Sequence, residues 1–476
     1  MSEADVKENQ PEDEATALSG AAPESESLDE ENRLKPEFVR NVKDALDAED
    51  FDRVYDLVEP LHPADIADLF ELIDGDERLT LARSIRDLMG VEVIAELNDW
   101  VRELLVGDLP ADVVAGFAEQ LDTDDAVAML EDLDEEDQQA VLAEMEPEDR
   151  AAIESALSYP EESAGRLMSR EFVAAPETMT VGDLIDFLRE HRELPTEFWE
   201  VFIVDPMHRP VGTCALSWIL RCPRNIPLHD VMKRDQTLIP AGMDQEEVAL
   251  RFQKYALISA AVVDDAGRLI GQITVDDIVH IIQEEAGEDA LAMSGAGDGD
   301  INEPLPRTIR GRMWWLFINL LTALLASSVV AFFQGTIEKL VVLAVIMPII
   351  TGMGGNAATQ TMAVTVRALA TNQLTSSNTW RMIAREWWIA SANGIGLGVL
   401  MALGCLAIYH DAMLSFVVIL AMVLNSLNAG LSGVLIPLGL EKLKIDPAVV
   451  STVFVTTMTD TLGFFFFLGL ASIFLM

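Results

Sequence analysis

The spacing of apolar residues divides the chain into three regions. Between Lys35 and Leu157, apolar residues recur three and four positions apart, as amphipathic helices require. From 164 to 285, short apolar runs alternate with helical spacing, which predicts strands and helices in turn. After Arg312 come five stretches almost without charge, at 313–337, 340–366, 387–409, 412–440 and 447–476. Each can cross about 30 Å of hydrocarbon, for which about 20 helical residues suffice.

The first region predicts an all-α stack of short helices over 32–158. Three helix starts resemble one another, each with a proline followed two residues later by an acid, at 62–65, 109–112 and 146–149. Proline suits the first helical position, and the free amides there favour negative charge. The starts are unequally spaced, so we expect repeated hairpins without a strict period.

The middle region contains two copies of one α+β unit, at 159–225 and 226–284. The copies align at an offset of 64 residues in their first half and 59 in their second, and the difference falls in a loop at 191–198. They resemble a tandem pair of CBS domains, and the second copy keeps that family's GxxTxxD ending as Gly271, Thr274 and Asp277. The resemblance implies that Thr274 and Asp277 can hold a nucleotide ribose, although both residues could equally cap a helix. The first copy departs from this ending.

Charge separates the first 300 residues from the rest. The chain has 80 acids, 32 bases and a net charge of -48, and only seven acids and nine bases follow residue 300. We therefore expect an acidic water-soluble part joined to a five-helix α-helical transmembrane domain at 313–476, in a multidomain membrane protein. The acidity disfavours nucleic-acid binding and favours cations. The acidic segment 1–31 is expected to be disordered, and the three cysteines predict neither disulfides nor a zinc site.

The positions of the bases predict the orientation in the membrane. Eight bases lie before the first stretch, between the second and third, and between the fourth and fifth, whereas the opposite side has only Lys339. Because basic loops stay inside, we expect a cytoplasmic N-terminus and an extracytoplasmic C-terminus.

Asp460 lies near the middle of the fifth stretch and is expected to be the only deep acid in the five helices. A carboxylate at that depth costs roughly 3 kcal/mol or more unless it faces a cavity or a partner. No lysine or arginine is available within the membrane, which favours a cation site over a protonated structural aspartate.

The second stretch carries Pro348 and a glycine cluster at a similar depth, in the run PIITGMGGN. Proline and glycine together predict a break in this helix that would line a water-filled cavity. Close helix packing through small residues is the alternative. The candidate oxygen donors are Gly352, Gly354, Gly355, Asn356, Thr359 and Gln360.

Four motifs in order resemble the MgtE family of magnesium channels: the helical amino-terminal region, YPEESAGRLM, MPIITGMGGNAATQ and the ending DPAVVSTVFVTTMTDTLGFFFF. The resemblance covers about residues 35–476. It implies a homodimer in the cell inner membrane that serves magnesium homeostasis, with the second and fifth helices lining a pore and Asp460 at its ion site. It also implies a connecting helix and linker at 285–312 that plugs the pore when internal Mg²⁺ is abundant.

Acids near the end of the second CBS copy are candidate regulatory ligands for Mg²⁺. Asp277, Glu285, Glu288 and Asp289 fall broadly on one side of a helix. Bridging by Mg²⁺ would relieve their repulsion and favour the closed state, whereas the alternative is an ordinary solvated helix face.

Mg²⁺ suits the candidate pore because it keeps several waters while one or two carboxylates hold it. A proton-coupled divalent cation carrier, with CBS domains that sense adenine nucleotides, is the alternative. ATP as a regulatory ligand therefore stays open. No residues resemble a catalytic constellation, and we predict no enzyme activity.

Overall fold

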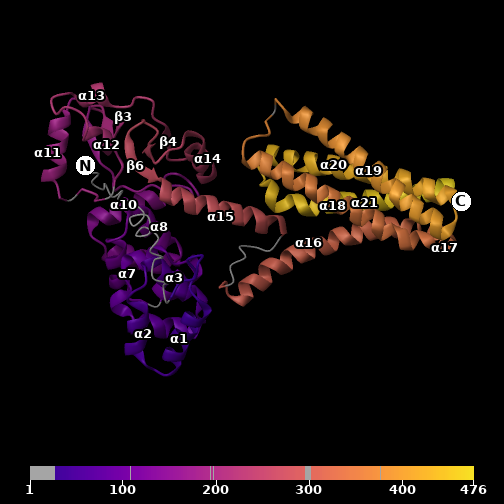
Figure 1. Ribbon diagram of the computed structural model, residues 1–476, viewed down its shortest axis with the longest axis horizontal. Coiled ribbons are helices and arrows are strands. Elements are labelled where there is room, and N and C mark those ends of the chain that lie inside the picture. The colour runs from indigo at the N-terminus through magenta and orange to yellow at the C-terminus, as the bar shows by residue number, and fades with distance from the viewer. Residues whose placement is uncertain (1–26, 108, 193, 197, 295–301, 376) are drawn as a thin grey trace, which may run out of the picture. The chain divides into compact units, whose positions relative to one another are not determined.

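The computed structural model describes residues 27–107, 109–192, 194–196, 198–294, 302–375 and 377–476 (Figure 1). The chain forms two compact units, one ending at Ile278 and the other beginning at Val279. Most of the tail predicted to be disordered, and residues 295–301 of the predicted linker, lie outside the described residues.

Short helices occupy the first part of the amino-terminal unit, as predicted. Pro63 and Pro147 are the first residues of two of them, and the third proline, Pro110, takes the capping position just before its helix. The helices pack in two successive apolar cores, centred on residues such as Phe70 and Leu130. Their bounds are α1 Pro36–Asp47, α2 Phe51–Val58, α3 Pro63–Leu72, α4 Gly75–Ser84, η1 Arg86–Leu88, α5 Val91–Ala95, α6 Asp99–Val106, α7 Ala111–Ala118, α8 Thr123–Glu131, α9 Glu135–Glu144 and α10 Pro147–Leu157.

Two copies of one α+β unit follow, which confirms the predicted repeat. In each copy a parallel strand pair and an antiparallel pair make a three-stranded sheet, in the orders β1-β2-β3 and β4-β5-β6. Both predicted offsets hold, since β1 and β4 begin at residues 174 and 238 and β2 and β5 at 200 and 259. The bounds are β1 Ala174–Pro176, α11 Val181–Glu190, β2 Glu200–Val204, β3 Pro210–Ala215, α12 Leu216–Ile219, α13 Leu228–Val231, β4 Leu238–Pro240, α14 Gln245–Tyr255, β5 Ser259–Val263, β6 Leu269–Thr274 and α15 Val275–Ser294.

The second unit contains five helices long and apolar enough to cross a membrane (Figure 1). Among them α20 is the most enclosed: half of the residues in its most apolar segment are buried, whereas in α16 the share is 6%. It packs against α18, α19 and α21 and so forms the centre of the bundle. The bounds are α16 Leu305–Phe332, α17 Gln334–Lys339, α18 Val342–Ala370, α19 Thr379–Tyr409, α20 Ala412–Lys442 and α21 Pro447–Phe474.

One sequence prediction is corrected by these helices. The predicted break at Pro348 and the glycines is wrong, because α18 is helical throughout. The helix α15 continues past residue 284, where the second CBS copy was predicted to end, and runs to Ser294. The helix α19 begins at Thr379 and includes Glu386, an acid outside the predicted stretch that is buried within the bundle.

Candidate ion pathway and regulatory sites

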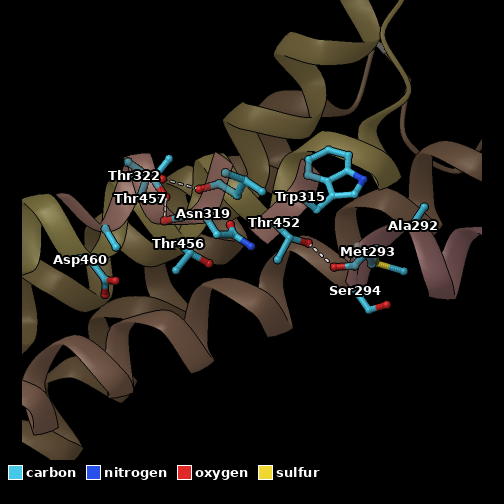
Figure 2. Close-up of a pocket in the computed structure, with 12 residues that line it drawn as sticks. Ala292, Met293, Ser294, Trp315, Asn319, Thr322, Thr452, Thr456, Thr457 and Asp460 are labelled. Atoms are coloured by element: carbon cyan, nitrogen blue, oxygen red, sulfur yellow. Dashed lines mark hydrogen bonds between the residues drawn. The ribbon is translucent and has the colours of Figure 1, made fainter. Parts of the chain in front are cut away.

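Asp460 lines a polar pocket of about 260 Å³ within the membrane unit. Figure 2 shows Asp460 at one end of this pocket and the last residues of α15 at the other. Hydroxyl and amide groups line part of the wall between them, from Asn319 and Thr322 on α16 and from Thr452, Thr456 and Thr457 on α21. The rest of the wall is apolar and includes Trp315, Ala323 and Val453. Neutral oxygens of this kind, beside one carboxylate, suit a small cation that keeps its water.

The end of α15 is attached to α21 at the mouth of this pocket. The Thr452 hydroxyl donates a 2.7 Å hydrogen bond to the backbone carbonyl oxygen of Met293 (Figure 2). The side chain of Met293 also packs against an apolar cluster that includes Met362 and Val455. Because the last four carbonyls of a helix have no partner within it, this bond gives α15 a defined docking point.

The residues predicted to supply oxygens on α18 divide between two faces. Gly352, Asn356 and Thr359 are exposed in the single chain, and Gly355 is half-buried. Gly354 is buried, and a Cβ atom there would lie 2.1 Å from Nδ2 of Asn425 on α20. Gly354 is therefore a packing contact, whereas the others share an uncovered helix face.

None of the described residues of α18 lines the pocket beside Asp460. Within one chain the structure therefore does not bring the GMGGN segment and Asp460 into one cavity, although α18 and α21 pack together. The Thr359 hydroxyl is turned back on its own helix, where it donates to Gly355 O at 3.0 Å.

Glu386 is an acid that the sequence prediction placed outside the helices. It is 6% exposed, and one carboxylate oxygen accepts a 3.1 Å hydrogen bond from Thr361 on α18. The stretch predicted from the absence of charge began at residue 387, and the start of α19 about two turns earlier brings Glu386 into the bundle.

Thr274 and Asp277, the candidate ribose ligands, bond to each other at the start of α15. The Thr274 hydroxyl donates to Asp277 Oδ2 at 2.6 Å, and the Thr274 amide donates to the same oxygen at 3.2 Å. Thr180 and Asp183 make a capping box of the same kind at the start of α11 in the first copy, which is not the position that matches α15. The helix-capping role is thus present, and nucleotide binding by this pair stays a prediction.

The four candidate regulatory acids fall into two groups. Asp277 lies close enough to Asp124 and Asp125 of the helical domain to raise the pKa of both carboxyl groups. Asp289 lies near Glu285 and Asp446, and its pKa is raised first by burial and then by these two charges.

Asp124 is the most unusual acid of the helical domain. Burial, followed by the charges of Asp277 and Asp125, holds its pKa well above the usual range, and its Oδ1 is buried without a hydrogen-bond partner. Burial, followed by the charges of Asp277 and Asp122, raises the pKa of Asp125 to about 6. The run LDTDD at 121–125 was the available signal, but sequence alone did not show that it faces Asp277. The described residues include no group of three side chains already placed to hold a metal ion.

The fold and these sites define a class: multi-span membrane proteins that join a helical domain and a CBS pair to a bundle with an acid beside a polar pocket. Family models match in the same order: the MgtE intracellular N domain at 61–162, the CBS domain at 228–284 and the divalent cation transporter MgtE at 347–470. The chain belongs to the MgtE family of magnesium transporters.

Relatives of similar length support this assignment. The magnesium transporter MgtE of Bacillus subtilis is 30% identical over 88% of this chain and 93% of its own length. The magnesium transporter MgtE of Thermus thermophilus is 29% identical over 93% of this chain and 99% of its own length. The solved cytosolic domain of the Mg²⁺ channel MgtE in complex with ATP is 27% identical, with a TM-score of 0.47, and covers 51% of this chain and 99% of that structure.

Proposed function

We propose that two copies of this chain form a membrane pathway for Mg²⁺ uptake, which closes when Mg²⁺ binds to the acidic internal part. The observation that carries the proposal is Asp460 at one end of a polar pocket whose other end is bounded by α15. An unpaired carboxylate beside neutral oxygens suits a divalent cation and repels anions.

Mg²⁺ is the ion that best fits this chemistry. It prefers oxygen ligands, dehydrates reluctantly and is usually held by one or two carboxylates with several waters retained. No histidine or cysteine lines the pocket, so softer metals such as zinc or copper lack their preferred ligands there. Asp460 would attract the ion, and the hydroxyls of α21 would bond to its waters.

A homodimer would cover the exposed face of α18. Gly352, Asn356 and Thr359 share that face, and a Cβ atom at Gly352 or Gly355 would meet nothing within 4 Å in the single chain. A second copy against this face would enclose a pathway lined by α18 and α21 of both chains. It would also supply a second Asp460, and Mg²⁺ is usually held by one or two carboxylates.

The gate in this proposal is α15, which is one continuous helix of 20 residues. Its first turn carries Asp277, near Asp124, and its last turn contains Met293, bonded to Thr452. Mg²⁺ among the acids at the first turn, and around Glu285, Glu288 and Asp289, would offset their repulsion and hold α15 in place. The ion would thereby favour the closed state, because it binds that state more tightly.

The orientation follows from the bases: N-terminus in the cytoplasm and C-terminus outside the inner membrane. The acidic half would then face the internal Mg²⁺ that it senses. Adenine nucleotide binding at Thr274 and Asp277 is a separate proposal that the gate does not need. The function is transport, and we assign no enzymatic reaction.

Flux into liposomes tests the function. Purified protein would be placed in vesicles that contain a Mg²⁺-sensitive dye and an internally negative potential, with a protonophore that brings protons to electrochemical equilibrium and so removes the net driving force on them. We expect Mg²⁺ entry that continues with the protonophore present. Entry that requires an inward proton gradient would instead support the alternative, a proton-coupled carrier. No entry under either condition would overturn both.

A further inference from the structure

Asn425 is a buried amide at the centre of the membrane bundle. It lies near the middle of α20, and only 1% of its surface is exposed. Its Nδ2 donates a 2.9 Å hydrogen bond to the backbone carbonyl oxygen of Ile350 on α18. A buried polar side chain between apolar helices is costly unless it is bonded, so its presence there calls for a physical reason.

Glycines on two different helices make room for this amide. A Cβ atom at Gly354 on α18 would lie 2.1 Å from Asn425 Nδ2, closer than atoms can approach. A Cβ atom at Gly463 on α21 would lie 3.0 Å from Asn425 Oδ1 and 3.1 Å from Nδ2. The side chain of Asn425 therefore lies between α18 and α21, in two notches, which are the spaces left by the missing side chains of Gly354 and Gly463.

Both notches adjoin the proposed ion pathway. Gly354 lies within the segment whose other face carries Gly352 and Asn356. Gly463 follows Asp460 by three residues, which is about 4.5 Å along the helix. A change in the separation of α18 and α21 at Asn425 would consequently move Asp460 relative to that face.

We propose that Asn425 is a positioning residue that sets the separation of the two pathway helices and thereby the preference of the ion site for Mg²⁺ over larger divalent cations. This inference rests on the proposed transport function. The hydrogen bond to Ile350 fixes α18, and the contact with Gly463 fixes α21. Asn425 itself need not touch the ion.

The carbonyl oxygen of the Asn425 side chain adds to this argument. Asn425 Oδ1 is buried and has no hydrogen-bond partner among the described residues. An amide used only to stabilise packing would be replaced at little cost by leucine, which has nearly the same size and leaves no polar atom unsatisfied. The presence of asparagine at this position is explained if the donor half of the amide is needed at Ile350.

The test compares three substitutions by flux in the same liposomes. Asn425→Leu keeps the bulk and removes the donor, Asn425→Ala removes both, and Asn425→Asp keeps a donor whenever the buried acid is protonated. Mg²⁺ and Mn²⁺ entry would be measured separately and normalised to correctly folded protein by size-exclusion chromatography. Asn393→Leu, at an exposed position on α19, is the matched control.

We expect the ratio of Mg²⁺ to Mn²⁺ entry to fall about tenfold in Asn425→Leu and Asn425→Ala, the size expected when a buried hydrogen bond is lost. In Asn425→Asp the ratio should return toward the wild-type value at pH 6, and Asn393→Leu should keep it. A wild-type ratio in folded Asn425→Leu would overturn the inference.

Two further outcomes separate a positioning role from other causes. If Asn425→Leu only lowers the amount of folded protein, with the ratio unchanged, the residue is structural and the inference is wrong. If wild-type protein passes no Mg²⁺, the transport proposal fails first. Gly354→Ala alone should disrupt folding, because its Cβ atom collides with the Asn425 amide. The double variant Gly354→Ala, Asn425→Ala should fold again, because the alanine methyl fills the space that the amide leaves. Its ratio of Mg²⁺ to Mn²⁺ entry should stay below the wild-type value, because the hydrogen-bond donor to Ile350 is still missing.

Discussion

The hydroxyl of Thr452 on α21 donates a 2.7 Å hydrogen bond to the carbonyl oxygen of Met293, in the last turn of α15. Thr452 lines the same pocket as Asp460. The helix that begins in the second CBS copy is thus joined directly to the helix that carries the candidate ion site. If the Thr452–Met293 hydrogen bond forms in the closed state of the ion pathway, removing it will favour the open state.

Thr452→Val should weaken closure. Valine keeps the shape but cannot donate, and one hydrogen bond is worth about 0.5–1.5 kcal/mol, so the open fraction at high internal Mg²⁺ should rise roughly twofold to thirteenfold. Patch recordings with Mg²⁺ on the internal side would measure it. The matched control is Thr457→Val, because the Thr457 hydroxyl lines the same pocket but bonds only to Val453 O of its own helix. Equal effects in both variants would argue against the Met293 contact.

The acids at the end of α15 should govern closure by internal Mg²⁺. The charges of Glu285 and Asp446 contribute to the raised pKa of Asp289, which shows that repulsion accumulates where α15 meets the membrane unit. The triple variant Glu285→Gln, Glu288→Gln and Asp289→Asn should remain open at millimolar internal Mg²⁺. Recordings would compare it with Glu284→Gln on the same helix, which should close normally. Unchanged closure in the triple variant would contradict this form of the gate.

Stability should depend on pH and on Mg²⁺ through Asp124 and Asp125. Their pKa values are higher in the folded protein than in the unfolded chain, and that of Asp125 is about 6. The folded state therefore holds more protons from about pH 4 upward, and the free energy of unfolding contributed by these groups falls as pH rises toward and beyond 6. Bound Mg²⁺ would offset that loss.

We expect Mg²⁺ to raise the melting temperature of the full-length protein more at pH 7.5 than at pH 5. The double variant Asp124→Asn, Asp125→Asn should be more stable than wild type without metal, by about 1 kcal/mol at pH 7.5, because it removes a buried charge. Its Mg²⁺ response should be smaller. Asp137→Asn, at an exposed site on α9, is the control. A Mg²⁺ shift that is equal in all three proteins would exclude these acids as ligands.

Sequence reasoning recovered the architecture because the decisive signals are local. The repeat offsets of the CBS copies and the lengths of the apolar stretches depend on nearby residues alone. The strands match those offsets and α20 and α21 begin at the predicted residues 412 and 447, whereas α16 and α19 each begin eight residues before their predicted starts. The position of Asp460 near the middle of the fifth stretch came from the same counting, and its depth in the membrane stays a prediction.

The predictions that failed depended on contacts between distant segments. Pro348 and three nearby glycines favour a break, yet α18 stays helical because α20 and α21 pack against it. In the sequence Gly354 suggests a flexible position, whereas in the structure its lack of a side chain leaves room for Asn425, 71 residues later. The pairing of Asp124 with Asp277 spans two domains, and no local pattern could indicate it.

The orientation in the membrane can be tested with a cysteine appended after Met476. In a background without Cys214, Cys222 and Cys405, we expect an impermeant maleimide to label it from outside intact cells, because the basic loops hold the other side in the cytoplasm. A cysteine placed at Ser377, in the loop before α19, should be labelled only after lysis. The reverse pattern would place the acidic half outside and remove it from internal Mg²⁺.

The most direct test of the account is Mg²⁺ entry through Asp460→Asn in liposomes. Asparagine keeps the size and removes the charge, so uptake per folded dimer should fall at least tenfold, while Asp411→Asn, which alters the cap of α20, should stay near wild type. Normal dimer assembly by size-exclusion chromatography would show that the loss is not one of folding. Wild-type Mg²⁺ entry in the folded Asp460→Asn protein would contradict the assignment of Asp460 as the ion site.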